Sequence, residues 1–104
     1  VRESAHPYAA ATDVFETLHF PGASQMTLRF DARTQTDSGS DYVAIYRDAS
    51  HSSTWGRGRY SGKADNFPGA GARPPLIVPS DMCVLHFHSD LGGGHWGFRV
   101  EVEA

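Results

Sequence analysis

Hydrophobic and polar residues alternate in five separate segments of this chain. In "MTLRF" (26–30), Met26, Leu28 and Phe30 lie on one face and two polar residues lie on the other. The same period of two recurs in four further segments: "ETLHF" (16–20), "DYVAIYR" (41–47), "MCVLHFHS" (82–89) and "WGFRVEVE" (96–103). Because this alternation is typical of half-buried antiparallel strands, each segment is predicted to form one.

The segments between these strands are rich in glycine, proline and other turn residues. Examples are "FPGAS" (20–24), "TDSGSD" (36–41), "FPGAGARPP" (67–75) and "DLGGG" (90–94). Many short strands joined by such turns predict an all-β fold, which we interpret as an antiparallel β-sandwich. Residues 49–75 lack clean alternation, so we expect loops there with one short strand near "GRYSG" (58–62).

Length and charge narrow the possible functions. A chain of 104 residues is expected to form a single domain, 1–104. The start at Val1 and the end directly after a strand pattern lead us to expect a fragment of a larger protein. The net charge is −3 and the basic residues are dispersed, which argues against nucleic-acid binding. No apolar run approaches the roughly 20 residues that a membrane-spanning helix needs.

Cys83 is the single cysteine of the chain, so it cannot form an internal disulfide. Small extracellular β-domains usually carry disulfides, and their absence favours a reducing, cytoplasmic location. Cys83 alternates with Leu85 and Phe87 on the apolar face of its segment. We therefore expect a buried thiol without catalytic reactivity.

Three aspartates stand at the ends of predicted strands. Asp31 follows "TLRF", Asp41 precedes "YVAIY" and Asp90 follows "LHFHS". If these strand ends share one pole of the sandwich, three carboxylates meet there and repel one another. A Ca²⁺ ion would relieve the repulsion, since it takes 6–8 oxygen ligands, and the glycines after Asp90 would let the backbone approach it. The alternative is that each aspartate is an ordinary solvated loop residue.

The histidines raise the possibility of a zinc site. His86 and His88 are two residues apart on one predicted strand, so they share a face, whereas Cys83 points to the other face. Structural zinc is bound by four ligands. His95 or His19 would have to be brought next to His86 and His88 by the tertiary fold to complete the site. The alternative is an ordinary polar sheet face.

Enzymatic and carbohydrate-binding functions are two further possibilities. The sequence has no G-x-S-x-G elbow and no glycine-rich loop leading into a helix, so we expect no enzyme. A carbohydrate-binding sandwich is the alternative, because six aromatic residues are available for stacking on sugars: Tyr8, Tyr42, Tyr46, Trp55, Tyr60 and Trp96. For Trp96 we expect packing under the glycine turn, where it would hold Asp90 in place.

The order of the motifs along the whole chain resembles a CUB domain. The resemblance is carried by "SAHPY" (4–8), "LHFPGASQMTLRFD" (18–31), "SDYVAIY" (40–46), "YSG" (60–62) and "PPLIVPSDMCVLHFHSDLGGGHWGFRV" (74–100). More narrowly, the chain is similar to cysteine-poor CUB-like modules of very large intracellular proteins, such as ZZ-type zinc-finger and EF-hand proteins and giant ubiquitin ligases. The two disulfides of extracellular members are missing here.

The resemblance implies a jelly-roll β-sandwich that serves as a non-catalytic protein-interaction or scaffolding module. Calcium-binding CUB domains use acids at the positions that correspond to Asp31, Asp41 and Asp90. Gly92 stands where the family has a serine or asparagine, so the resemblance implies a weak calcium site. In such domains the ion orders the surrounding loops, and an exposed carboxylate oxygen pairs with a lysine or arginine of a protein partner. The partner-binding residues themselves have no signature in the sequence.

Overall fold

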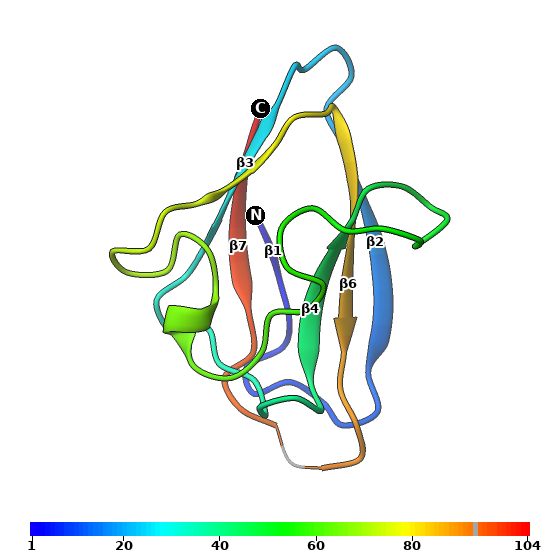
Figure 1. Ribbon diagram of the computed structural model, residues 1–104. Helices are drawn as coiled ribbons and strands as arrows, with labels where there is room; N and C mark the ends of the chain where they lie inside the picture. The colour runs from blue at the N-terminus through cyan, green and yellow to red at the C-terminus, as the bar shows by residue number, and fades with distance from the viewer. Residues whose placement is uncertain (93) are drawn as a thin grey trace.

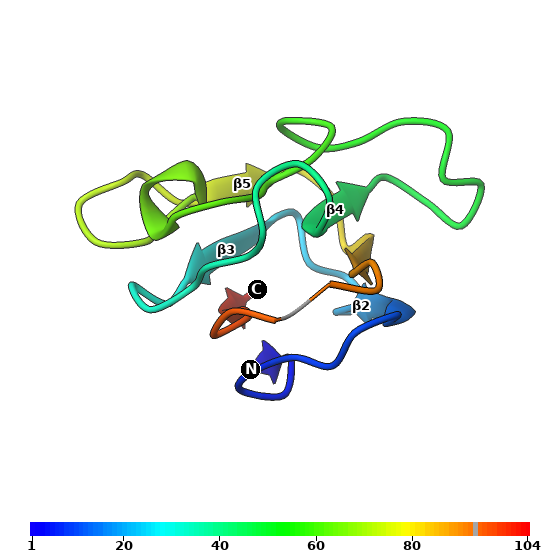
Figure 2. The same ribbon diagram turned by 90° about the horizontal axis from the view of Figure 1, so that it is seen from below.

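The computed structural model describes residues 1–92 and 94–104 as two antiparallel β-sheets packed face to face. One sheet has the order β1-β7-β3-β5 and the other the order β2-β6-β4, and Figures 1 and 2 show them as two layers. The strands are β1 (Arg2–Glu3), β2 (Asp13–His19), β3 (Met26–Phe30), β4 (Tyr42–Tyr46), β5 (Leu76–Val78), β6 (Met82–His88) and β7 (Arg99–Glu103). One short 3₁₀-helix, η1 (Ala64–Asn66), lies between β4 and β5. The predicted all-β sandwich is confirmed.

The core lies between the sheets and is built by the alternating positions that the sequence indicated. Met26, Leu28 and Phe30 of β3 are buried, while Arg29 between them is exposed. Phe67 of the loop after η1 adds a fully buried ring that packs on Phe30. Burial of alternate side chains from both sheets is the usual source of stability in such sandwiches.

Strand β4 is buried on both faces, which simple alternation does not predict. Its burial follows from the segment 53–60, which runs along the free edge of β4. The backbone N–H groups of Trp55 and Tyr60 donate to the carbonyls of Ile45 and Val43 at 2.8 Å each. This segment satisfies the polar groups of an otherwise open edge, and its Arg59 guanidinium covers the Tyr42 ring at 4.1 Å.

Two short strands and one expected strand differ from the sequence prediction. β1 and β5 were not predicted, because segments of two and three residues are too short to show a period. The short strand expected near "GRYSG" is instead a single β-bridge between Tyr60 and Val43. The rest of residues 49–75 is loop and the η1 turn, as expected.

The start of β4 and the end of β6 meet at one pole of the sandwich. Tyr42 is paired with His88 in the register, and both strand ends lie at the lower end of the molecule in Figure 1, where the loop that follows β6 also lies. The strand ends that carry Asp41 and Asp90 therefore share a pole, whereas Asp31 lies beside Arg99 of β7, where its backbone N–H donates to the Arg99 carbonyl at 2.7 Å.

Cys83 is fully buried on β6, and this burial raises the pKa of its thiol to about 11. We expect the native protein to react with a thiol reagent far more slowly than the unfolded protein, because the thiolate is the reactive form. Cys83→Ser should cost about 1–3 kcal/mol of stability through a buried hydroxyl without a partner. Native-state thiol labelling checks the first point and urea denaturation the second; labelling at the rate of a free cysteine would contradict the burial.

Candidate functional site: an acidic cluster at one pole

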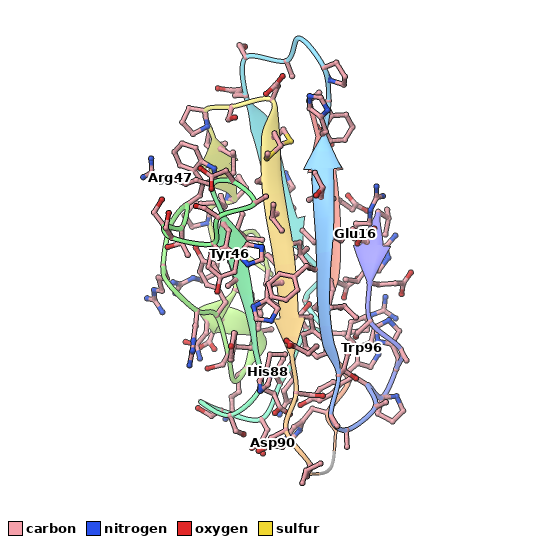
Figure 3. The ribbon with its side chains drawn as sticks, turned by 90° about the vertical axis from the view of Figure 1, so that its right-hand side faces the viewer. Glu16, Tyr46, Arg47, His88, Asp90 and Trp96 are labelled. Carbon is pink, nitrogen blue, oxygen red and sulfur yellow. The ribbon has the colours of Figure 1, made fainter. Side chains whose placement is uncertain are left out.

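Three carboxylates meet at the pole described above, and they come from Asp37, Asp41 and Asp90. Each contributes one oxygen atom, and the three oxygens all lie within 4.8 Å of one another. Asp37 and Asp41 belong to the loop that leads into β4, whereas Asp90 follows β6; Figure 3 shows Asp90 at this end of the molecule. Two of the three predicted aspartates are therefore brought together, and Asp37 stands with them in place of Asp31.

Asp41 is the fixed centre of the cluster. Its side chain is fully buried, and both carboxylate oxygens accept hydrogen bonds. The Tyr8 hydroxyl donates to Oδ2 (2.5 Å), and the backbone N–H of Asp90 donates to Oδ1 (2.8 Å). Burial, followed by the bond to Asp41, raises the pKa of Tyr8 to about 12, so this hydroxyl remains a donor at neutral pH.

Asp37 reaches the cluster through a tight turn in "TDSGSD". The backbone N–H of Asp41 donates to the Asp37 carbonyl at 3.1 Å, and Gly39 within the turn has a φ of +85°. Tyr8 also contributes, since its hydroxyl oxygen accepts the backbone N–H of Asp37 at 3.0 Å. Two acids on either side of a glycine turn are the sequence signal that could have identified Asp37. Tyr8 offered no such signal.

The Asp31 carboxylate is neutralised by arginine. Arg33 donates to both of its carboxylate oxygens, from Nε to Oδ1 and from Nη2 to Oδ2, at 3.0 Å each. Nη1 of Arg99 lies 3.8 Å from Oδ2. These bonds, with those of Arg33 the largest cause, lower the pKa of Asp31 to about 2. The predicted meeting of Asp31 with Asp41 and Asp90 does not occur, because the guanidinium two residues away takes its carboxylate.

The Asp31–Arg33 pair predicts a defined pH dependence. The pKa of Asp31 in the folded state, about 2, lies below its unfolded value near 3.9. The stabilisation is therefore complete above about pH 4 and disappears as the pH falls towards 2. We expect Asp31→Asn to lose about 1 kcal/mol at neutral pH, because the pair is partly solvated. Urea denaturation at several pH values checks this; an equal loss at pH 2 would contradict it.

Few positive charges face the acidic cluster, in contrast to Asp31. Among residues 1–92 and 94–104, one ion pair involves a carboxylate of the cluster: His95 Nε2 lies 4.0 Å from an Asp37 oxygen. The Gly92 N–H donates to Asp90 Oδ1 at 2.8 Å, and a side chain at Gly92 would lie 3.0 Å from the same oxygen. A glycine at this position therefore leaves space beside the carboxylates, while Gly93 lies outside the described residues. Three close acids with so little compensation can bind a cation.

Trp96 does not pack under the glycine turn, so that expectation is wrong. Its ring stacks on His6 with the ring centroids 3.7 Å apart, and the Arg33 guanidinium lies 4.7 Å from its centroid. Trp96 is half-buried against the N-terminal segment and the β3–β4 loop. The backbone N–H of Gly92, rather than this indole, supports the Asp90 carboxylate.

The other aromatic residues with a possible role in sugar stacking are also engaged in packing. Tyr8, Tyr42 and Tyr60 are buried. Trp55 is half-buried, and the Arg47 guanidinium covers its ring at 4.0 Å. Tyr46 is half-buried and stacks on His51 and His86. Each of the predicted aromatic residues is thus buried or stacked against a neighbouring side chain.

Among the histidines, His86 and His88 do share a face, but His95 lies near Asp37 instead of near them. Asp13 of β2 completes their group. Its hydrogen bond with His86, the largest cause, lowers the pKa of Asp13. Neither of the two histidines expected to complete the set does so, since His19 pairs with Asp81 at 3.3 Å. Asp13 takes this position because β2 pairs with β6.

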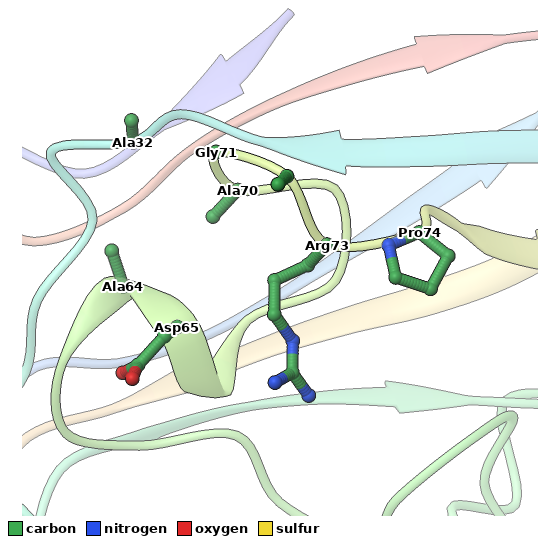
Figure 4. A pocket seen from close by; sticks show the side chains of 8 residues that line it. Ala32, Ala64, Asp65, Ala70, Gly71, Arg73 and Pro74 are labelled. Carbon is green, nitrogen blue, oxygen red and sulfur yellow. The ribbon is translucent and has the colours of Figure 1, made fainter.

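A pocket of about 440 Å³ lies apart from the acidic cluster, between η1 and the loop that precedes β5 (Figure 4). Alanine, glycine and proline form most of its wall, and Asp65 and Arg73 are its charged residues. An acid and a guanidinium without a neighbouring nucleophile do not form a catalytic arrangement.

No helix in the described part of the chain has the length and hydrophobicity to cross a membrane.

Two solved structures share this architecture over 99% of the chain. The CUB1-EGF-CUB2 domain of human MASP-1/3 superimposes with a TM-score of 0.77 at 20% identity, and the match covers 38% of that chain. The MASP-1 CUB2 domain bound to Ca²⁺ superimposes with a TM-score of 0.73 at 21% identity, covering 89% of that chain. The protein folds as a CUB-like domain. No family model matches the sequence of this CUB-like domain.

Sequence relatives agree with this fold assignment. Zinc finger ZZ-type and EF-hand domain-containing protein 1 is 33% identical in Homo sapiens and 32% identical in Mus musculus, over 105 aligned positions and 100% of the chain. The CUB-like domain spans 3% of the length of these relatives. The predicted resemblance to a disulfide-free CUB-like module, of the kind found in a very large ZZ-type and EF-hand protein, is confirmed.

Proposed function

We propose that this CUB-like domain is a non-catalytic protein-interaction module whose acidic cluster, Asp37, Asp41 and Asp90, binds Ca²⁺. The observation that supports the proposal is the contrast between this cluster and Asp31. Asp31 is matched by two guanidiniums, whereas the three clustered carboxylates face, among the described residues, one histidine at 4.0 Å. A bound cation would compensate the negative charge of these carboxylates.

The donor set suits calcium in particular. Carboxylate oxygens are hard ligands, and calcium accepts 6–8 oxygens in flexible geometry. Asp41 is held from both sides by hydrogen bonds, while Asp37 and Asp90 are half-buried and can adjust. One similar solved structure, the MASP-1 CUB2 domain, is bound to Ca²⁺. Because Gly92 supplies no side-chain oxygen, we expect a dissociation constant in the ~10⁻⁴–10⁻³ M range of weak calcium modules.

The two loops that carry Asp37 and Asp90 would form the surface that binds a protein partner. Asp37 comes from the loop before β4 and Asp90 from the loop after β6, so shared ligation joins two loops into one rigid surface. Each of these two carboxylates is partly exposed and can accept a hydrogen bond from a lysine or arginine of a protein partner. Formation of the binding surface thus depends on the ion.

We also propose that this module lies inside the cell, as part of a longer protein. The single cysteine is buried and has no second cysteine to pair with in the chain, a composition typical of reducing compartments. The relatives are proteins of which a chain of this size spans 3%. Expression of the full-length protein with a fluorescent tag in intact cells checks the location; a secreted product would contradict it.

Thermal unfolding with and without calcium tests the calcium site. When free calcium exceeds its dissociation constant about 100-fold, binding adds about 2.7 kcal/mol to stability, which for a domain of this size is a rise in Tm on the order of 10 °C. Asp37→Asn should remove most of that rise, whereas Asp65→Asn, an acid of η1 outside the cluster, should keep it. An equal response to Mg²⁺, or from both variants, would contradict a specific site.

A further inference from the structure

The outer face of the three-stranded sheet carries a second group of metal-ligating side chains. His86 and His88 alternate on β6, and Asp13 of the neighbouring strand β2 lies directly opposite His88 in the register. Cross-strand neighbours on one face are close enough to interact directly. Figure 3 shows His88 on the β2-β6-β4 face that is turned to the viewer, above Asp90 and the acidic pole.

Both imidazoles converge on the same carboxylate oxygen. Nε2 of His86 lies 2.5 Å and Nδ1 of His88 lies 3.3 Å from Oδ1 of Asp13, and one atom of each residue falls within 4.8 Å of the others. Ligands held about 2.0–2.2 Å from a tetrahedral zinc ion lie about 3.3 Å apart. The His88 nitrogen already has that spacing from the Asp13 oxygen, and a small rotation of the exposed Asp13 side chain lengthens its contact with His86 towards it.

His86 is a buried polar group with little other bonding. Its side chain is 7% exposed, and Nδ1 is buried without a hydrogen-bond partner in the described residues. Among these residues, Nε2 is thus the ring atom that makes a hydrogen bond, and its partner is Asp13. An imidazole that is bonded on one side alone, towards a carboxylate and a second histidine, is an unusual arrangement for a buried polar side chain.

Aromatic rings fix the orientation of both histidines. Phe15 stacks on His86 with the centroids 4.0 Å apart, and Tyr42 stacks on His88 at 5.2 Å. The His88 side chain remains 37% exposed and that of Asp13 56% exposed, so the group opens to solvent on one side. The rings are held in place by packing, and a further ligand can approach from the water.

We propose that Asp13, His86 and His88 form a binding site for a zinc-type divalent ion, separate from the calcium pole. Two imidazole nitrogens and one carboxylate oxygen are the donors that Zn²⁺ prefers, and three protein ligands leave one position open for water or a partner's side chain. The ion would also join β2, an edge strand of its sheet, to the central strand β6. The site is independent of the calcium proposal, since the two groups share no residue.

Calorimetric titration of the metal-free protein with ZnCl₂ tests this proposal. Wild type should bind one ion, and Asp13→Asn and His88→Ala should each weaken binding by about 100-fold or more, beyond the effect usual for residues that merely support ligands. His19→Ala is the matched control, because His19 also pairs with an aspartate, Asp81, at 3.3 Å and belongs to the same strand β2 as Asp13. Circular dichroism confirms that each variant is folded.

Three results would overturn the proposal. The first is absence of zinc binding by the wild-type protein, and the second is equal weakening in His19→Ala, which would indicate general surface histidine binding. The third is competition between Zn²⁺ and Ca²⁺ for the same protein, because the proposed zinc ligands are distinct from Asp37, Asp41 and Asp90. Saturation by both ions together, with Co²⁺ giving the visible spectrum of a tetrahedral site, is the result that we expect.

Discussion

Asp41→Ala should lower the free energy of unfolding by about 2–4 kcal/mol in calcium-free buffer. The carboxylate is fully buried and accepts hydrogen bonds from the Tyr8 hydroxyl and the Asp90 backbone N–H. Alanine leaves both donors buried without a partner, and each costs about 1–3 kcal/mol. Relief of repulsion from the two neighbouring carboxylates reduces the total. Urea denaturation measures the difference.

Tyr8→Phe separates the two hydrogen bonds of Asp41. It removes the hydroxyl that also accepts the Asp37 N–H, but it leaves the bond from Asp90 intact, so it should cost less than Asp41→Ala. Calcium should stabilise the Tyr8→Phe protein and have no effect on the Asp41→Ala protein. A loss below about 0.5 kcal/mol for Asp41→Ala, the level usual at surface positions, would show that Asp41 does not organise the pole.

Phe87→Ala should cost about 3–5 kcal/mol, as large-to-small changes of buried aromatic residues do. The Phe87 ring is buried to 1% exposure and packs against Tyr8 and Phe98, with centroid distances of 5.1 and 5.2 Å. Since Tyr8 holds Asp41, the cavity should also loosen the acidic cluster and weaken calcium binding. Chemical denaturation gives the stability, and calorimetric titration with calcium gives the affinity.

Leu91→Ala is the control for this change. Leu91 is 87% exposed in the loop after β6, so its removal should alter stability by about 0.5 kcal/mol or less. If Phe87→Ala were as mild as Leu91→Ala, the packing assigned to the core beneath the cluster would be incorrect. If Phe87→Ala destabilised the domain without any effect on calcium, the link from core to cluster through Tyr8 would be incorrect.

The features that sequence could predict are those set by local periodicity. The period of two located five strands and the buried face that carries Cys83, Leu85 and Phe87. It also placed Asp41 and Asp90 at strand ends that share a pole, because antiparallel neighbours begin and end together. Burial of β4 on both faces depended on the segment 53–60, which has no periodic signal.

The features that sequence could not predict depend on which side chains compete for a partner. Asp31 occupies a strand end like the other two acids, but the Arg33 guanidinium reaches its carboxylate and removes it from the cluster. Asp37 joins the cluster because the turn at Gly39 folds it back. Asp13 meets His86 and His88 through strand pairing between residues more than seventy positions apart. The spacing of residues along the sequence does not indicate such contacts between distant side chains.

Two-dimensional amide NMR during a calcium titration locates the ion on the domain residue by residue. We predict saturable shifts of the Asp37, Asp41, Asp90 and Gly92 amides, with a dissociation constant of ~10⁻⁴–10⁻³ M and no comparable change at Asp31. Shifts that are still unsaturated when calcium exceeds that range of dissociation constants about tenfold, or saturable shifts centred on Asp31 and Arg33, would contradict a calcium site at the acidic cluster.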